Sequence, residues 1–173
     1  MFRKKGVVAL LILVMSFSVA SGQPDEFCNA ISTIMRDAPN KFRNIRGNVT
    51  NAGQNATSWS CGIKVPGTIN SRFVASLGLF YEGAFYQSAN KDGLKAVYER
   101  YKKLLTDCLS PQGYSLSLQD NFFEGVSEYK KVVLMPEIKE GTNTKNGPPH
   151  VTMEVTYSKQ VGFYTVVVYI FEH

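Results

Sequence analysis

Few residues of this chain belong to the types that mark well-known functional sites. Among 173 residues there are two histidines, three cysteines and one tryptophan, and only 19% of the residues are charged. No stretch matches a P-loop, a dinucleotide-binding G-x-G-x-x-G, a G-x-S-x-G nucleophile or an EF-hand loop. These absences exclude the well-marked enzyme classes and predict no cofactor. The hydrophobic fraction of 44% is that of an ordinary folded protein, not of a disordered or collagenous one.

The basic charge of the chain comes mostly from its first residues. Arg3, Lys4 and Lys5 precede the first acid, so the 19 bases and 14 acids of the whole chain leave 16 bases against 14 acids in the remainder. A net charge of +2 on that remainder does not provide the basic field that binding to nucleic acid requires. We therefore expect no nucleic-acid partner.

A secretory signal peptide is our interpretation of residues 1–22. Basic residues precede an apolar run of about 13 residues (7–19), and small residues follow it. A membrane span needs roughly 20 apolar residues, so a permanent anchor is the weaker alternative. Cleavage after Gly22, or after Ala20, would leave a single domain of residues 23–173 with no stable membrane anchor. No cysteine follows the run in a lipoprotein setting, so the sequence predicts a secreted or periplasmic protein.

Apolar residues at steps of three and four predict two amphipathic helices. The first extends from Asp25 to about Arg46, with a kink or restart at Pro39, because proline lacks the backbone N–H that a helix interior uses. The second carries an apolar stripe from Leu94 to Cys108. The polar, Asn-rich segment 48–57 is interpreted as a connector.

The rest of the chain has the alternation typical of strands. The last two strands form a predicted hairpin, and the final one is apolar on both faces, as in a central strand. We predict an α+β fold with a single antiparallel sheet of about five to six strands, two amphipathic helices packed on one face, and the order α-β-β-α-β-β-β-β. The two α-β-β stretches are compatible with a diverged duplication, although no repeat of individual residues is found. The expected strands are 58–65, 79–87, 114–119, 129–135, 151–157 and 163–171, with a loop over 139–149.

Three cysteines in an exported chain allow one internal disulfide. Cys61 shares a strand face with Trp59, and Cys108 lies on the apolar stripe of the second helix. A helix on that face would bring the two within disulfide distance, so Cys61–Cys108 is the favoured pair. A bridge that uses Cys28, as in Cys28–Cys61, and three unpaired thiols are the alternatives.

Histidines and carboxylates give little support for catalysis or metal binding. His150 and His173 lack the spacing of a metal site, and Cys108 lies near a helix C-terminus, where a thiolate is not favoured. We therefore predict no metal and no catalytic residue. Glu154 is expected on a strand surface. Three further carboxylates are expected in one solvated loop: Asp120, Glu124 and Glu128.

The strand aromatics indicate a binding surface. Tyrosine and phenylalanine, at 9 and 11 residues, exceed what two helices and one sheet face need, and they fall on both faces of their strands. The sheet face opposite the helices would then be an apolar, tyrosine-bearing surface. Phe80, Tyr86 and Tyr164 are the candidate ligand-binding residues. The alternative is that long loops or segment 66–78 cover this face.

The sequence thus predicts an exported, non-catalytic domain that binds a protein, a peptide or an apolar ligand. A secreted inhibitor or immunity-type protein is a special case of this hypothesis. The alternative from another class is an exported hydrolase-type enzyme with an unmarked active site. Asn48 and Asn55 begin formal N-glycosylation sequons, which matter only in a host that glycosylates. Oligomeric state is left open.

Overall fold

The chain folds as two consecutive segments, each with one α-helix followed by four strands. The computed structural model describes residues 23–119, 130–136, 147–158 and 162–172. The predicted signal segment, most of the predicted 139–149 loop, the three loop carboxylates and His173 lie outside these residues. The first segment comprises α1 (Gln23–Asp37), η1 (Ala38–Asn40), β1 (Arg46–Ala52), β2 (Thr57–Cys61), β3 (Asn70–Ala75) and β4 (Leu79–Ser88). The second comprises α2 (Leu94–Leu109), η2 (Ser110–Gln112), β5 (Tyr114–Gln119), β6 (Lys130–Pro136), β7 (Val151–Ser158) and β8 (Phe163–Phe171).

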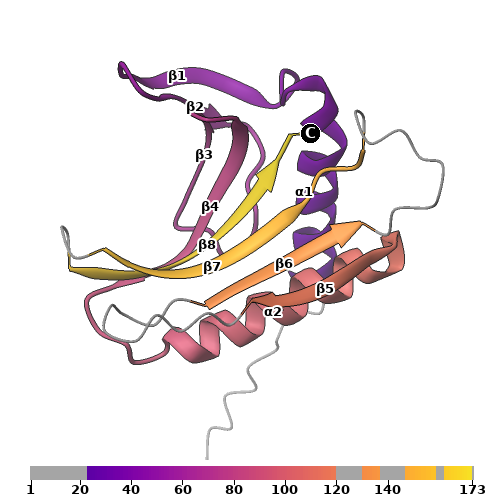
Figure 1. Cartoon of the computed structure of the whole chain (residues 1–173), viewed down its shortest axis with the longest axis vertical. Helices are drawn as coiled ribbons and strands as arrows, with labels where there is room; N and C mark the ends of the chain where they lie inside the picture. The colour runs from indigo at the N-terminus through magenta and orange to yellow at the C-terminus, as the bar shows by residue number, and fades with distance from the viewer. Residues whose placement is uncertain (1–22, 120–129, 137–146, 159–161, 173) are drawn as a thin grey trace, which may run out of the picture.

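All eight strands form one open antiparallel sheet in the order β1-β2-β3-β4-β8-β7-β6-β5 (Figure 1). The α+β class is therefore confirmed, but the sheet has eight strands rather than five to six. The final hairpin and the central position of the last strand are also confirmed, since β8 pairs with both β4 and β7. The two segments of the chain join through the β4–β8 pair.

The two strands that the prediction lacked are β1 and β3. Every β1 residue after Arg46 is exposed, so this edge strand buries no apolar side chain and shows no alternation. In β3 only Phe73 is buried. The predicted connector 48–57 is therefore largely strand, because backbone pairing with β2 holds an edge strand without help from its side chains.

The first helix is shorter than predicted, and the reason lies in the turn after Asp37. Pro39 falls in η1, and the next residues, Lys41 and Phe42, adopt left-handed φ values of 58° and 55°. The Asp37 carboxylate fixes this turn by accepting hydrogen bonds from the Asn44 backbone N–H at 3.0 Å and its side-chain amide at 2.6 Å. The chain therefore leaves the helix at Asp37 instead of restarting it after Pro39.

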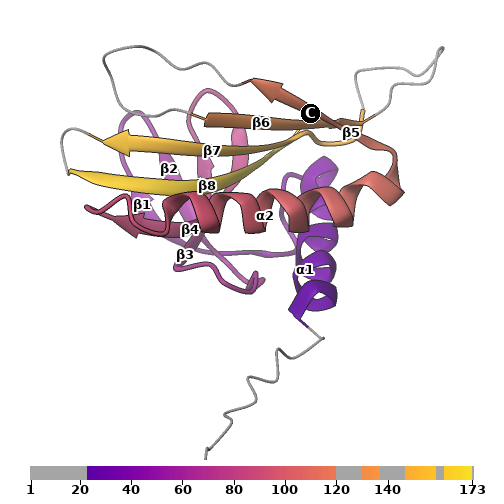
Figure 2. The ribbon, with the colours of Figure 1, turned by 90° about the horizontal axis from the view of Figure 1, so that it is seen from below.

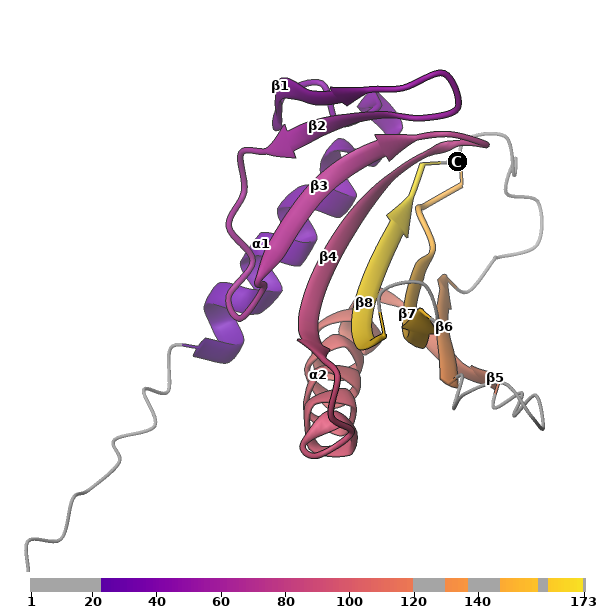
Figure 3. The same ribbon diagram turned by 90° about the vertical axis from the view of Figure 1, so that its left-hand side faces the viewer.

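The sheet is strongly curved, and both helices lie on its outer, convex side (Figure 3). Phe27 of α1 and Tyr101 of α2 both pack on Phe85 of β4, with ring centroids 6.0 and 4.1 Å away. Both helices therefore contribute to the same core. From β8, Val166, Val168 and Ile170 are fully buried in it.

A disulfide joins the helices where α1 crosses near the C-terminal half of α2 (Figure 2). It links Cys28 to Cys108, with their Cα atoms 5.3 Å apart, and Cys61 is a free cysteine. The predicted Cys61–Cys108 pair is therefore wrong. The physical reason is that α2 packs along β4 and β8, whereas Cys61 ends β2, which is separated from β4 by β3.

Candidate functional site

The concave face of the sheet, opposite the helices, carries a row of rings. Val74 of β3 pairs with Phe80 of β4, which pairs with Phe171 of β8. The Phe171 backbone N–H donates to the carbonyl of His150, just before β7, at 3.2 Å. These residues therefore lie side by side across the centre of the sheet. Directly opposed residues of antiparallel strands project to the same face, so their side chains share the concave side.

Four rings on this face contact one another, and we call them the aromatic row: Phe80, Tyr169, Phe171 and His150. Phe80 lies 5.7 Å from Tyr169, edge to face, and 5.4 Å from Phe171 between ring centroids. His150 stacks on Phe171 at 4.5 Å with an interplanar angle of 15°. All four are half-buried. The four rings therefore form one cluster rather than isolated side chains.

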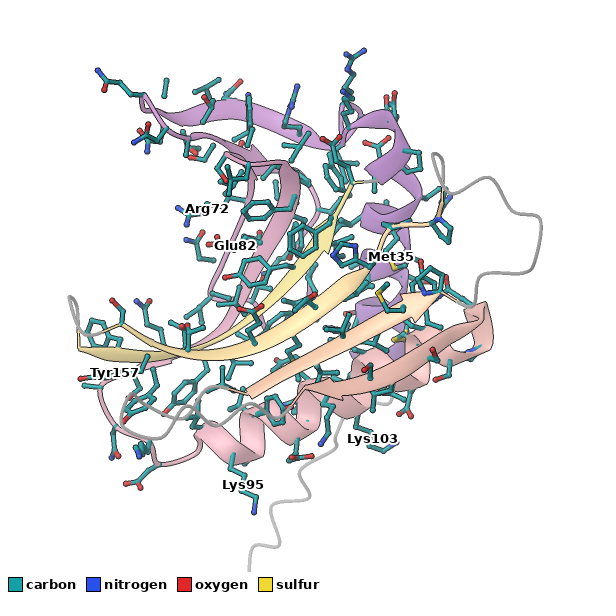
Figure 4. All side chains as sticks on the ribbon, in the orientation of Figure 1. Met35, Arg72, Glu82, Lys95, Lys103 and Tyr157 are labelled. Carbon is teal, nitrogen blue, oxygen red and sulfur yellow. A yellow bond between two sulfur atoms is a disulfide. The ribbon has the colours of Figure 1, made fainter. Side chains whose placement is uncertain are left out.

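A second, polar row lies beside the aromatic row. Arg72 of β3 forms an ion pair with Glu82 of β4, with a guanidinium nitrogen 2.8 Å from a carboxylate oxygen. Figure 4 shows both side chains pointing into the concave space. By strand register, Glu82 pairs with Tyr169, and Tyr169 pairs with Thr152 of β7. The concave face therefore has an apolar part and, one row away, groups that donate and accept hydrogen bonds.

Two residues on the concave face are shielded from solvent although they point away from the helices. Thr152 is only 2% exposed and Val167 only 7%. On a flat sheet with one open face, such residues would be accessible to solvent. Part of the concave face is therefore buried although no helix covers it.

Of the three predicted ligand-binding residues, the structure places only Phe80 on the concave face. Tyr86 follows a register irregularity between Ala84 and Tyr86, which brings it opposite Val166, on the helix side. Tyr164 alternates with buried Val166 and also packs against the helix-side core. The prediction treated β4 as evenly alternating, and a bulge reverses the faces beyond it.

The hydroxyl of Tyr86 has a structural role in the loop before α2. It lies 2.6 and 2.8 Å from the carbonyl oxygens of Asn90 and Asp92, to which it donates. We expect Tyr86→Phe to lower the free energy of unfolding by about 0.5–1.5 kcal/mol, the usual contribution of one hydrogen bond. Urea denaturation measures this change. Tyr164→Phe, a matched variant on the neighbouring strand, is expected to change it less, and equal effects would contradict the role assigned to Tyr86.

Phe171 and His150 were not among the predicted binding residues, and the sequence predicted no site for His150. Cross-strand register places these residues next to Phe80. That register can be assigned only once β4 and β8 are known to be neighbours. Glu154 lies on the same face of β7, as its strand position predicted, but it is half-buried rather than on the surface.

Among the residues that the structure describes, burial shifts the pKa of three groups, and all three belong to the helix-side core. It raises the pKa of Tyr114 to about 12, and the Tyr114 hydroxyl donates to the carbonyl of Pro149 at 2.8 Å. It also raises the pKa of the Tyr81 hydroxyl and of the Cys61 thiol. A thiol with a raised pKa stays protonated at neutral pH and is a poor nucleophile. Cys61 is therefore not poised for catalysis.

In the described part of the chain, no three His, Cys, Asp or Glu side chains gather in a way that would hold a metal ion. No helix among residues 23–119, 130–136, 147–158 and 162–172 is long and apolar enough to cross a membrane.

No protein-family model matches this chain, and neither the curated proteins nor the solved structures include a significant match to it. A functional assignment therefore rests on the concave face and on the strand register that places residues there. A hollow that is open to solvent lies between the start of α1 and the loop after β2. It is lined by Glu26, Asn29, Lys64, Pro66 and Gly67.

Proposed function

We propose that the chain is an exported, non-catalytic binding domain whose concave sheet face takes an apolar ligand. The observation that carries this proposal is the aromatic row, four half-buried rings, each in contact with at least one other, on the face opposite the helices. Burying apolar area releases about 25 cal/mol per Å². A cluster of four partly exposed rings therefore gives an apolar group a favourable place to bind.

The ligand class follows from the neighbouring polar row. Arg72 and Glu82 satisfy each other, yet their side chains remain 45% and 21% exposed. A molecule that lies on the rings can extend a polar group to this pair without leaving either charge unpaired. We therefore propose an amphipathic ligand, with an apolar or aromatic body on Phe80 and Phe171 and a polar end toward Arg72.

Export is part of the same proposal. The Cys28–Cys108 disulfide supports it, because such bonds persist in oxidising compartments and are rare in reducing ones. The basic and apolar pattern of residues 1–22 supports it independently. Together they favour a secreted or periplasmic location.

Binding can be tested with the fluorescent probe 8-anilinonaphthalene-1-sulfonate, which has an aromatic body and one charged group. We expect saturable binding to the wild type and at least tenfold weaker binding to Phe171→Ala, because that ring contacts both Phe80 and His150. A tenfold loss corresponds to about 1.4 kcal/mol.

The matched control is Phe163→Ala, at the other end of the same strand, where the ring is 37% exposed. This variant should keep the wild-type affinity. Thermal denaturation establishes that both variants are folded at the titration temperature. Equal affinities for Phe171→Ala and the wild type would contradict the proposed site.

A further inference from the structure

The two edges of the sheet differ in regularity. The β1 edge has register irregularities at two places in its pairing with β2. The β5 edge pairs with β6 in continuous register, from Tyr114 opposite Pro136 to Gln119 opposite Lys131. An edge strand presents unpaired N–H and C=O groups on alternate residues, and a bulge disrupts that row. β5 therefore offers a regular template for another strand, and β1 does not. Figure 3 shows the two edges at opposite ends of the curved sheet.

The composition of β5 also differs from that of a protected edge. Natural edge strands usually carry charged residues, proline or a bulge, which prevent pairing with other chains. β5 reads Tyr-Ser-Leu-Ser-Leu-Gln, with neither charge nor proline. Ser115, Leu116 and Ser117 are exposed, and Leu116 is 40% accessible to solvent.

We propose that β5 pairs in antiparallel fashion with β5 of a second copy of this chain. Such a pair has twofold symmetry, so each residue of β5 in one copy pairs with a residue of β5 in the other copy. When the pairing is centred on Leu116, that leucine faces its own copy and Ser115 faces Ser117. The uncharged strand meets no like charge across the axis, whereas a charged strand would repel itself.

The side chains on the helix side favour the same partner. Leu116 lies opposite Leu134 of β6, which is fully buried in the core. In the symmetric pair the two Leu116 side chains would cover each other and continue this core from one copy into the next. The two concave faces would then belong to one continuous sheet. Pairing through the β5 edge does not depend on the proposed ligand.

The molar mass of the purified protein in solution tests the inference. Size-exclusion chromatography with light scattering is expected to give twice the mass of one chain at micromolar concentration. Leu116→Lys should give the mass of one chain, because it places two ammonium groups at the axis. The matched control is Val49→Lys on the β1 edge, where the valine is 55% exposed. It should remain a dimer.

Three results would overturn the proposal: a monomeric wild type up to millimolar concentration, a dimeric Leu116→Lys, or a monomeric Val49→Lys. Circular dichroism shows whether each variant is folded. Should Leu116→Lys fail to fold, the double variant Ser115→Lys/Ser117→Lys replaces it, because both serines are exposed on the other face and each faces the other across the pairing, so that like charges oppose each other. A dimer that persists in this double variant then counts against the β5 interface.

Discussion

Replacing Cys28 and Cys108 together with serine is expected to lower the free energy of unfolding by about 3–4.5 kcal/mol. The disulfide closes a loop between residues 80 positions apart. A loop of that length removes much of the conformational freedom of the unfolded chain, and its loss restores that freedom. The bond also joins α1 to α2, so without it the first helix is held by side-chain packing alone. Urea denaturation followed by circular dichroism measures the change.

Two controls make this prediction specific to the bridge. Cys61→Ser should leave stability within about 1 kcal/mol of the wild type, because Cys61 is a free, half-buried cysteine. Dithiothreitol should shift the wild-type unfolding curve toward that of the double variant and leave the double variant unchanged. Three reactive thiols in the denatured, unreduced protein, instead of one, would rule out the disulfide.

Gly67→Ala is expected to destabilise the protein by about 2–4 kcal/mol, a large effect for one added methyl group. Gly67 has φ +85, a left-handed conformation that favours glycine. An added Cβ would also lie 1.8 Å from the Tyr101 hydroxyl oxygen. Tyr101 is 6% exposed and packs on Phe85, so its ring has little room to move away. The change in unfolding free energy is again measured in urea.

Gly93 provides the matched control for this substitution. Its φ is +83, nearly that of Gly67, but no atom lies within 4 Å of the position where a Cβ would stand. Gly93→Ala should therefore lower the free energy of unfolding only by the cost of holding alanine in a left-handed backbone conformation, about 1 kcal/mol. The difference between the two variants isolates the steric contact with Tyr101. If the two variants lost the same free energy of unfolding, a steric clash with the Tyr101 hydroxyl would be ruled out.

Elements that bury a regular apolar face were predictable from the sequence. The α2 helix, β4 and the β7–β8 hairpin each have such a face, and their predicted positions agree with the structure. β1 buries nothing along most of its length, so no pattern of side chains marks it. The first helix was predicted too long because the apolar residues after Asp37 continue the helical spacing. Phe42 is buried from a left-handed turn, not from a helix.

The candidate site was only partly predictable, because it depends on which strands are neighbours. A ring-bearing face opposite the helices follows from the excess of aromatic residues, and Phe80 was placed there from its strand position. Tyr86 could not be placed correctly, since one irregularity in β4 reverses the alternation. The disulfide depends in the same way on how α1 and α2 cross. The spacing of the cysteines along the chain does not predict that crossing.

The position of β8 at the centre of the sheet has a kinetic consequence. Its partner β4 lies 76 to 91 residues earlier in the chain, as the pairs Ser88–Tyr164 and Phe80–Phe171 show. Contacts between such distant residues form late, because the intervening chain must first lose its freedom. Until then β4 and β7 both have an open backbone edge, so aggregation competes with folding at this stage. Slow refolding that loses yield as protein concentration rises is the expected kinetic signature of this strand order.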